Sequence, residues 1–272
     1  MLKGWKKINI EDIEMLRKMN ENIEVIEYFN SIICQMHSRM MYKIIDKELV
    51  ICKGSTIMGN YSIVKYGNMN NSDEVKNKMK ESGITLRGYD IAGKKDKFGD
   101  EYVYDTDECV KMAGKKYKRF RKVLSRYGKK ITYKTGYDED IEYLILKYPN
   151  HQNKLFNFIK KYLNMVKITR IYYNKELLGF SIVENINKKN GIIIQELINH
   201  DCEIHDASYL IHYYNCKNNE GKYLNAGGVR IKGIRFAKNK LRPVKLLTIR
   251  RVISDRRLTK EDWKLMRNSL KG

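Results

Sequence analysis

The chain has 272 residues and a net charge of +22, and its length suffices to bury the core of one large domain or two ordinary ones. A hydrophobic content of 42% excludes a disordered chain, and no apolar run approaches the roughly 18 residues of a membrane span. Five scattered cysteines without a C-x-x-C pair, and an N-terminus without an apolar signal core, predict a cytoplasmic protein with free thiols and no membrane partner.

The first part of the chain predicts a helical start followed by strands. A helix follows Asn9, which can cap it, with Asp12 in its first turn. A second capped helix begins after Ser72 and ends at Gly83. The other predicted elements are helical periodicity over 23–41, strands over 42–54, 61–68, 84–90 and 100–105, and a loop over 91–99.

The second part repeats this order more completely. Residues 107–127 predict a basic helix, because Tyr117, Phe120, Leu124 and Tyr127 share one face. Further predicted helices cover 138–148, 153–166, 206–216, 231–241 and 260–270, the last capped by Thr259, and predicted strands cover 168–174, 177–186, 191–198, 222–228 and 244–252. We therefore expect an α+β protein of two units, 1–106 and 107–272, the first a worn copy of the second.

Positive charge is concentrated in two windows of the sequence. Between Cys109 and Tyr137 there are 11 Lys or Arg and no acid, and between Gly221 and Ser254 there are 10 more, again with no acid. A merely solvated helix would interleave Glu or Asp to form i,i+4 pairs. The segregation favours an anion-binding surface, with nucleic acid as the expected partner.

Three stretches, 100–128, 192–214 and 223–247, resemble the C-terminal catalytic domain of bacterial phosphatidylglycerol lysyltransferases, and the similarity runs from about residue 25 to 250. The wider group includes the Fem-type aminoacyltransferases. The matching positions are Tyr102, Tyr104, Gly114, Lys115, Lys116, Tyr117, Arg121, Tyr127, Glu196, Tyr209, Asn225, Gly233, Arg235, Lys238 and Pro243. The resemblance implies a tandem GNAT-like (acyl-CoA N-acyltransferase) fold of mixed, mostly antiparallel sheets flanked by helices. In that fold, two central strands part and the donor's acyl group lies between them.

The resemblance and the charge pattern together define candidate site residues. Glu196 is expected as the general base, on one strand face with Ile192 and Ile194, and Tyr209 and Tyr223 are candidate proton donors to the leaving group. A surface salt bridge for Glu196 and core positions for the tyrosines are the structural alternatives. The candidate donor- and phosphate-binding residues are Lys115, Lys116, Lys118, Arg119, Arg121, Lys122, Arg126, Asn225, Gly228, Arg230, Lys232, Gly233, Arg235 and Lys238.

No metal site is predicted. His200, Cys202 and His205 follow no standard zinc spacing and lack an evident fourth ligand, so a polar loop is the expected structure. The expected co-substrate is an aminoacyl-tRNA or an acyl-coenzyme A. Only Arg230 and Gly233 remain of the usual coenzyme A pattern, and a tight strand-to-helix turn explains them equally well.

These observations predict an enzyme, an acyltransferase or aminoacyltransferase that moves its group to an amine or hydroxyl. Nucleic acid would be the donor, as charged tRNA, or the acceptor, as a DNA base that a phage modifies. The alternative is a non-catalytic nucleic-acid-binding protein on a degenerate GNAT scaffold. The sequence does not predict an oligomeric state.

Overall fold

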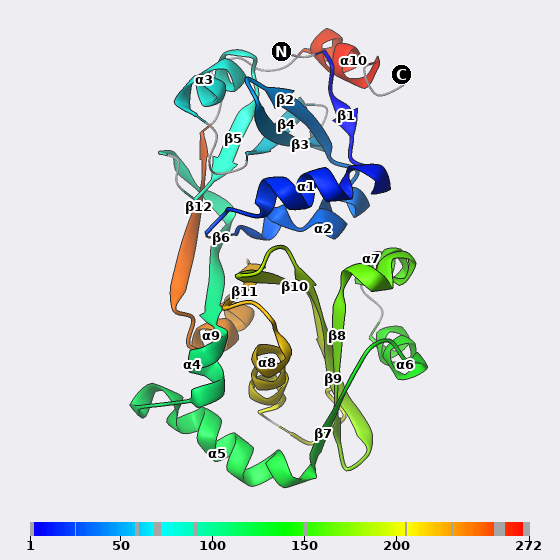
Figure 1. The fold of residues 1–272 in the computed structure, drawn as a ribbon, viewed down its shortest axis with the longest axis vertical. Coiled ribbons are helices and arrows are strands. Elements are labelled where there is room, and N and C mark those ends of the chain that lie inside the picture. The colour runs from blue at the N-terminus through cyan, green and yellow to red at the C-terminus, as the bar shows by residue number, and fades with distance from the viewer. Residues whose placement is uncertain are drawn as a thin grey trace. The chain divides into compact units, whose positions relative to one another are not determined.

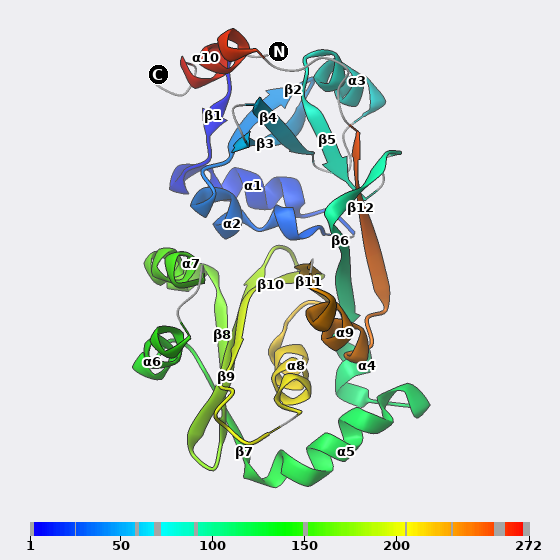
Figure 2. The same cartoon turned by 180° about the vertical axis from the view of Figure 1, so that it is seen from behind.

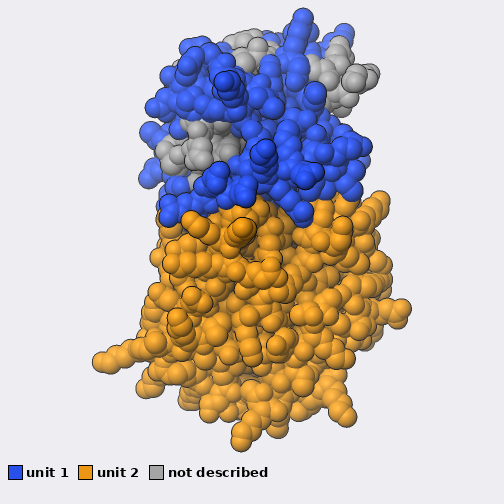
Figure 3. All heavy atoms as spheres, in the orientation of Figure 1, with its two compact units in different colours: residues 1–100, 247–272 blue, residues 101–246 orange. Residues whose placement is uncertain are grey.

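The computed structural model describes residues 3–24, 26–57, 60–67, 72–89, 92–148, 152–204, 206–229, 231–252 and 259–268. It divides the chain into two compact units (Figure 3). Unit 1 consists of residues 1–100 and 247–272, and unit 2 of residues 101–246.

Unit 1 is a mixed sheet with three helices from the first part of the chain and one from the end. Its elements are β1 (Lys6–Lys7), α1 (Ile13–Asn20), α2 (Ile32–His37), β2 (Met41–Ile45), β3 (Glu48–Ile57), β4 (Asn60–Gly67), α3 (Asp73–Glu81), β5 (Thr85–Gly88), most of β12 (Lys245–Val252) and α10 (Lys260–Asn268). Strands β1 to β4 are antiparallel, β5 is parallel to β4, and β12 is antiparallel to β5. Trp5, Val75 and Met79 are fully buried in its core.

Unit 2 repeats the series of three antiparallel strands, a helix and a strand, with additional elements before it. Its elements are the end of β6 (Lys94–Asp105), α4 (Thr106–Lys111), α5 (Lys118–Tyr127), β7 (Ile131–Thr135), α6 (Glu139–Lys147), α7 (Gln152–Ile159), β8 (Lys167–Tyr173), β9 (Glu176–Asn185), β10 (Asn190–Ile198), α8 (Ala207–Asn218), β11 (Tyr223–Gly228) and α9 (Lys232–Lys240). Strands β7 to β10 are antiparallel neighbours, β11 is parallel to β10, and β6 is antiparallel to β11.

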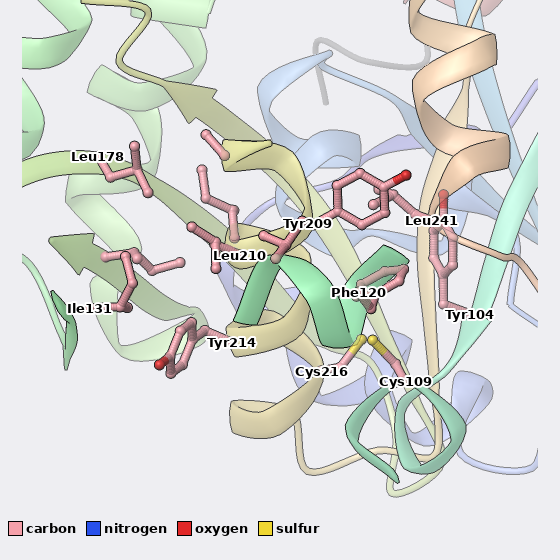
Figure 4. Close-up of a cluster of buried hydrophobic side chains, with 14 of the residues drawn as sticks. Tyr104, Cys109, Phe120, Ile131, Leu178, Tyr209, Leu210, Tyr214, Cys216 and Leu241 are labelled. Carbon is pink, nitrogen blue, oxygen red and sulfur yellow. The ribbon is translucent and has the colours of Figure 1, made fainter. Parts of the chain in front are cut away.

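Helix α8 packs on one face of the unit 2 sheet, and α6 and α7 lie on the other (Figure 1). Gly179 of β9 allows the close approach of α8, because a Cβ there would lie 2.5 Å from Cδ1 of Ile211. Phe120 from α5, Tyr209 and Leu210 from α8, and Tyr104 from β6 fill the space beside it (Figure 4). The helix is therefore buried around most of its circumference, including the polar residues His212 and Asn215.

The helix starts follow the predicted capping chemistry. The backbone N–H of Asn9 donates to the Asp12 carboxylate at 2.8 Å, and that of Val75 donates to Ser72 Oγ at 3.3 Å. Thr259 and Asp262 bond each other's backbone N–H groups at 2.9 and 3.1 Å. These hydrogen bonds confirm the predicted caps. The caps could be predicted because each depends on a few adjacent residues.

Several local predictions differ from the structure. Among the described residues of the helical periodicity predicted over 23–41, only Ile32–His37 forms an α-helix, α2. The helix predicted over 107–127 is interrupted, because Met112 (φ 49°) and Gly114 (φ 78°) adopt left-handed conformations between α4 and α5. Strand β6 begins at Lys94, within the loop predicted over 91–99. Strand β7 was not predicted, since only Ile131 of its five residues is buried and the alternation of a half-buried strand is lacking.

The unit boundary also differs. The sequence assigned 107–272 to the second unit, whereas the structure returns residues 247–272 to the first. The reason is strand pairing: Arg250 and Val252 of β12 pair with Gly88 and Leu86 of β5. In the part of the chain that is described, no helix is long and apolar enough to span a membrane.

Candidate functional site

Strands β10 and β11 part after three residue pairs. Their parallel register runs only from Asn190–Tyr223 to Ile192–Asn225, although β10 continues to Ile198 and β11 to Gly228. Beyond this point β10 stays paired with β9 and β11 with β6. Each strand also has an irregularity where the shared ladder ends. Bulges at this position turn the strands apart, and such a parting is what the family resemblance implied.

The bulge in β10 sets the direction of Glu196. Its register jumps between Ile193 and Gln195, so Glu196 pairs with Ser181 and lies on the same face as Ile193. The predicted face, shared with Ile192 and Ile194, is therefore wrong: simple alternation ignores the extra residue. The face that Glu196 occupies is the one covered by α8, because Ile193 belongs to the core cluster that α8 fills.

Asn215 of α8 holds the Glu196 carboxylate. Its Nδ2 donates to Glu196 Oε2 at 3.3 Å, while its Oδ1 accepts from the hydroxyl of Ser181. Burial raises the pKa of Glu196, and nearby His212 and Lys238 partly oppose this effect. A carboxylate with a raised pKa beside parted strands suits a general base.

Lys238 of α9 faces the end of β11. Its Nζ donates to the backbone carbonyls of Ala226 and Gly227, the latter at 3.1 Å. Burial lowers the pKa of Lys238 to about 8, against the opposing charges of Glu196 and Glu101. The hydroxyl of Tyr104 donates to the Lys238 carbonyl at 3.0 Å. Helix α9 lies beside β11 and α8 in both views (Figures 1 and 2).

Asn225, predicted as a donor-binding residue, forms hydrogen bonds within the protein. Its Nδ2 donates to Glu101 Oε2 at 3.0 Å, and its Oδ1 accepts from the N–H of Gly227 at 2.7 Å. Asn225 and Glu101 are both buried. This network holds the left-handed turn at Gly227 (φ 67°) at which β11 departs from β10.

The two tyrosines predicted as proton donors lie apart. Tyr209 is buried against the ring of Phe120, at 4.7 Å between centroids, and Asp206, Arg119 and Arg242 act on its raised pKa, which burial mainly causes. Tyr223 pairs with Asn190 at the start of β11, about 20 Å along the strand from Glu196 at ~3.3 Å per residue. Of the two, Tyr209 lies close to residues of the basic windows, because Arg119 and Arg242 act on its pKa.

The first basic window forms an exposed surface on α5 and the turn before it. Some of its charge is used within the fold: Arg119 makes a two-point contact with Asp206, Lys116 pairs with Glu108, and Arg121 donates to backbone carbonyls of the turn. Lys118 and Lys122 form no ion pair with any residue that the structure describes. The remaining predicted residues, Lys115 and Arg126, are also exposed.

The second basic window meets the first within unit 2. Arg242 donates from Nε to the Lys116 carbonyl at 3.1 Å. On α9, Lys232 is exposed, Arg235 donates to the Val229 carbonyl at 2.7 Å, and a Cβ at Gly233 would meet open space. Gly228 ends β11, and Arg230 lies outside the described residues.

A sulfur-rich cluster lies near Glu196 and was not predicted from the sequence. Cys109, His212 and Cys216 are buried with their ligand atoms within 4.8 Å of one another. A hydrogen bond from the Cys216 thiol, with help from His212, lowers the pKa of Cys109 to about 5. The available signal was the His-x-x-x-Cys spacing, which places 212 and 216 on one helix face. In the loop considered earlier, His200 is exposed, Cys202 is buried and His205 lies outside the described residues.

The order and pairing of the strands define the class of fold. Each unit has antiparallel strands, a helix, and a strand parallel to the last of them, and in unit 2 that parallel pair parts. The chain thus has the predicted tandem GNAT-like α+β fold, an acyltransferase fold.

Comparison with solved structures finds proteins of similar fold. A conserved protein of unknown function from Bacteroides thetaiotaomicron matches with a TM-score of 0.73 and 15% identity, over 93% of this chain and all of the other. The C-terminal domain of a protein assigned as a lysylphosphatidylglycerol synthetase from Agrobacterium fabrum matches with a TM-score of 0.65 and 11% identity, over 94% of this chain and 95% of the other. The L-PGS of Bacillus licheniformis matches with a TM-score of 0.63 and 12% identity, over 96% of this chain and 97% of the other.

These matches confirm the expected resemblance at the level of the fold. No protein-family model and no curated protein matches the sequence.

Proposed function

We propose that the protein is an aminoacyltransferase that takes an amino acid from charged tRNA and passes it to an amine or hydroxyl. The observation that carries this proposal is the position of Glu196, beside the parted ends of β10 and β11 and held by Asn215. The fold shared with synthetases of lysylphosphatidylglycerol, an aminoacyl ester, supports the reaction class.

In the proposed reaction, the acceptor nitrogen or oxygen attacks the ester carbonyl of the aminoacyl-tRNA. Glu196 takes the proton of the attacking group, and its raised pKa suits that role. Lys238 donates a proton to the departing ribose oxygen, for which a pKa of about 8 leaves it charged yet able to release the proton at neutral pH. The carbon–oxygen bond to tRNA breaks as the new bond forms.

Two features favour tRNA over coenzyme A as the donor. The loop that enters α8 carries Asp201, Glu203 and Asp206 and no glycine, and the N–H groups of Ala207 and Tyr209 already bond backbone carbonyls. Two N–H groups of this helix start that could bind a pyrophosphate are therefore already used within the protein. The joined basic windows offer a larger phosphate-binding surface, which suits a nucleic acid.

The test uses purified protein, tRNA charged with radiolabelled amino acids, and an acceptor pool of small metabolites or double-stranded DNA. Transfer moves the label from tRNA to an acceptor, and the receiving fraction distinguishes a small molecule from a DNA base. Glu196→Gln should lower the rate about 10²–10⁴-fold while tRNA affinity is kept, because the fold and the basic surface are unchanged. The matched control is Glu203→Gln, an exposed carboxylate of the following loop.

Equal rates for Glu196→Gln and the unaltered protein would remove Glu196 from the mechanism. Binding of tRNA without transfer to any fraction would support the non-catalytic alternative.

A further inference from the structure

Three side chains with ligand atoms for a soft metal converge between α4 and α8. The two sulfurs of Cys109 and Cys216 lie side by side (Figure 4), and Cys216 Sγ is 3.6 Å from His212 Nε2. In tetrahedral zinc sites, with Zn–S of about 2.3 Å and Zn–N of about 2.0 Å, a sulfur and a nitrogen ligand are about 3.5 Å apart and two sulfurs about 3.8 Å. All three ligand atoms already lie within 4.8 Å of one another, so small side-chain rotations would complete this spacing.

The surroundings hold the three residues in place. His212 and Cys216 are separated by one helical turn of α8, and α4, which carries Cys109, packs against α8. The His212 ring meets the edge of Tyr104 at 4.3 Å between centroids. All three residues are at most 2% exposed, so a bound ion would be shielded from bulk solvent and from competing ligands in solution.

We propose that Cys109, His212 and Cys216 bind one Zn²⁺ ion, with a water in the fourth position. Two thiolates and one imidazole form a ligand set that selects zinc over harder cations such as Mg²⁺. The ion would connect α4 to α8. Helix α4 leads into the turn before α5, and α8 carries Asn215, which holds Glu196. Binding of the ion at this site does not depend on the proposed transfer reaction.

The test measures metal binding by the full chain. Protein purified under reducing conditions should contain about one zinc ion per chain. Titration of the metal-free protein with Co²⁺ should give thiolate-to-cobalt charge-transfer absorption in the near ultraviolet that saturates at about one equivalent. Zn²⁺ should also raise the melting temperature of the full chain, since an ion that binds only the folded state stabilises it.

Two variants and a matched control locate the site. Cys109→Ser and Cys216→Ser should each weaken Co²⁺ binding by more than about 100-fold, the upper range for loss of groups that only support a ligand. Cys202→Ser is the control, because Cys202 is a buried cysteine of the same unit that does not belong to the group of Cys109, His212 and Cys216. Circular dichroism checks that each variant is folded, and the titration of the unaltered chain stands even if one is not.

The proposal is overturned if the unaltered chain shows no charge-transfer absorption, or if Cys216→Ser keeps its affinity. It is equally overturned if the native protein contains a Cys109–Cys216 disulfide, detected as a linked peptide by mass spectrometry.

Discussion

Lys238 shows how packing around a single residue changes its chemistry. In the sequence it is one of several basic residues of an amphipathic helix, whereas in the structure its ammonium group lies against β11 and bonds two backbone carbonyls. Burial disfavours the charged form and lowers the pKa to about 8 from the usual 10.5.

This shift predicts a pH dependence of stability. Between pH 8 and 10 the unfolded chain keeps the proton of Lys238 while the folded chain releases it, so the free energy of unfolding should rise with pH over this range. Urea unfolding at several pH values measures the rise. Lys238→Met should abolish it, and Lys240→Met, on the exposed side of the same helix, should not. A slope unchanged in Lys238→Met would show that Lys238 is normally solvated.

At the scale of one element, α5 combines a buried aromatic face with an exposed basic one. Tyr117, which precedes α5, is buried together with Phe120, Val123 and Tyr127 of the helix. Leu124, which was predicted on this face, is partly buried against the same core. On the exposed face, Lys118, Lys122 and Arg126 follow one another at i,i+4 spacing. Like charges at this spacing destabilise a helix, and a bound phosphate backbone would relieve the repulsion.

Lys122→Glu therefore separates folding from binding. The new carboxylate lies one turn from Lys118 and from Arg126, so the melting temperature should rise slightly. Affinity for tRNA should fall, and the log–log salt dependence should decrease by about 0.7–0.9 for each lost phosphate contact. Filter binding over a range of salt concentrations measures both. Lys154→Glu, on α7, is the control, and equal losses in the two variants would show that α5 is not the binding face.

At the scale of the whole molecule, the end of the chain completes the unit that its beginning forms. Strand β12 pairs with β5 at three positions, and the core of unit 1 contains Trp5, whereas the core cluster of unit 2 lies entirely between Tyr102 and Leu241. Loss of the last 26 residues should thus affect unit 1 and spare unit 2.

A chain ending at Leu246 tests this division. Trp5 is then its only tryptophan, since the other is Trp263, so fluorescence reports on unit 1 alone. The tryptophan emission should shift to the red at a lower urea concentration than in the full chain. Far-ultraviolet circular dichroism should retain a later transition from unit 2. Coincident transitions at the original urea concentration would contradict the division into these units.

Much of the fold could be predicted from the sequence because its determinants are local. Caps at Asn9, Ser72 and Thr259, and the periodicity of the helices, depend on residues a few positions apart. The tandem GNAT-like arrangement of the elements was implied by the family resemblance. The two acid-free windows were likewise visible as a count of charges. The break at Met112 and Gly114 was missed because helical periodicity on both sides masks a short left-handed turn.

What the sequence alone determined is therefore the capped helix starts and the basic windows, and its resemblance to a known family implied the fold class and Glu196 as a candidate base. Only the tertiary structure decided which face Glu196 occupies, that Lys238 and Asn215 lie beside it, that Cys109 meets Cys216, and that residues 247–272 complete unit 1. The physical reason is that a β-bulge and strand pairing between distant segments depend on contacts across the sheet, which no spacing along the chain records.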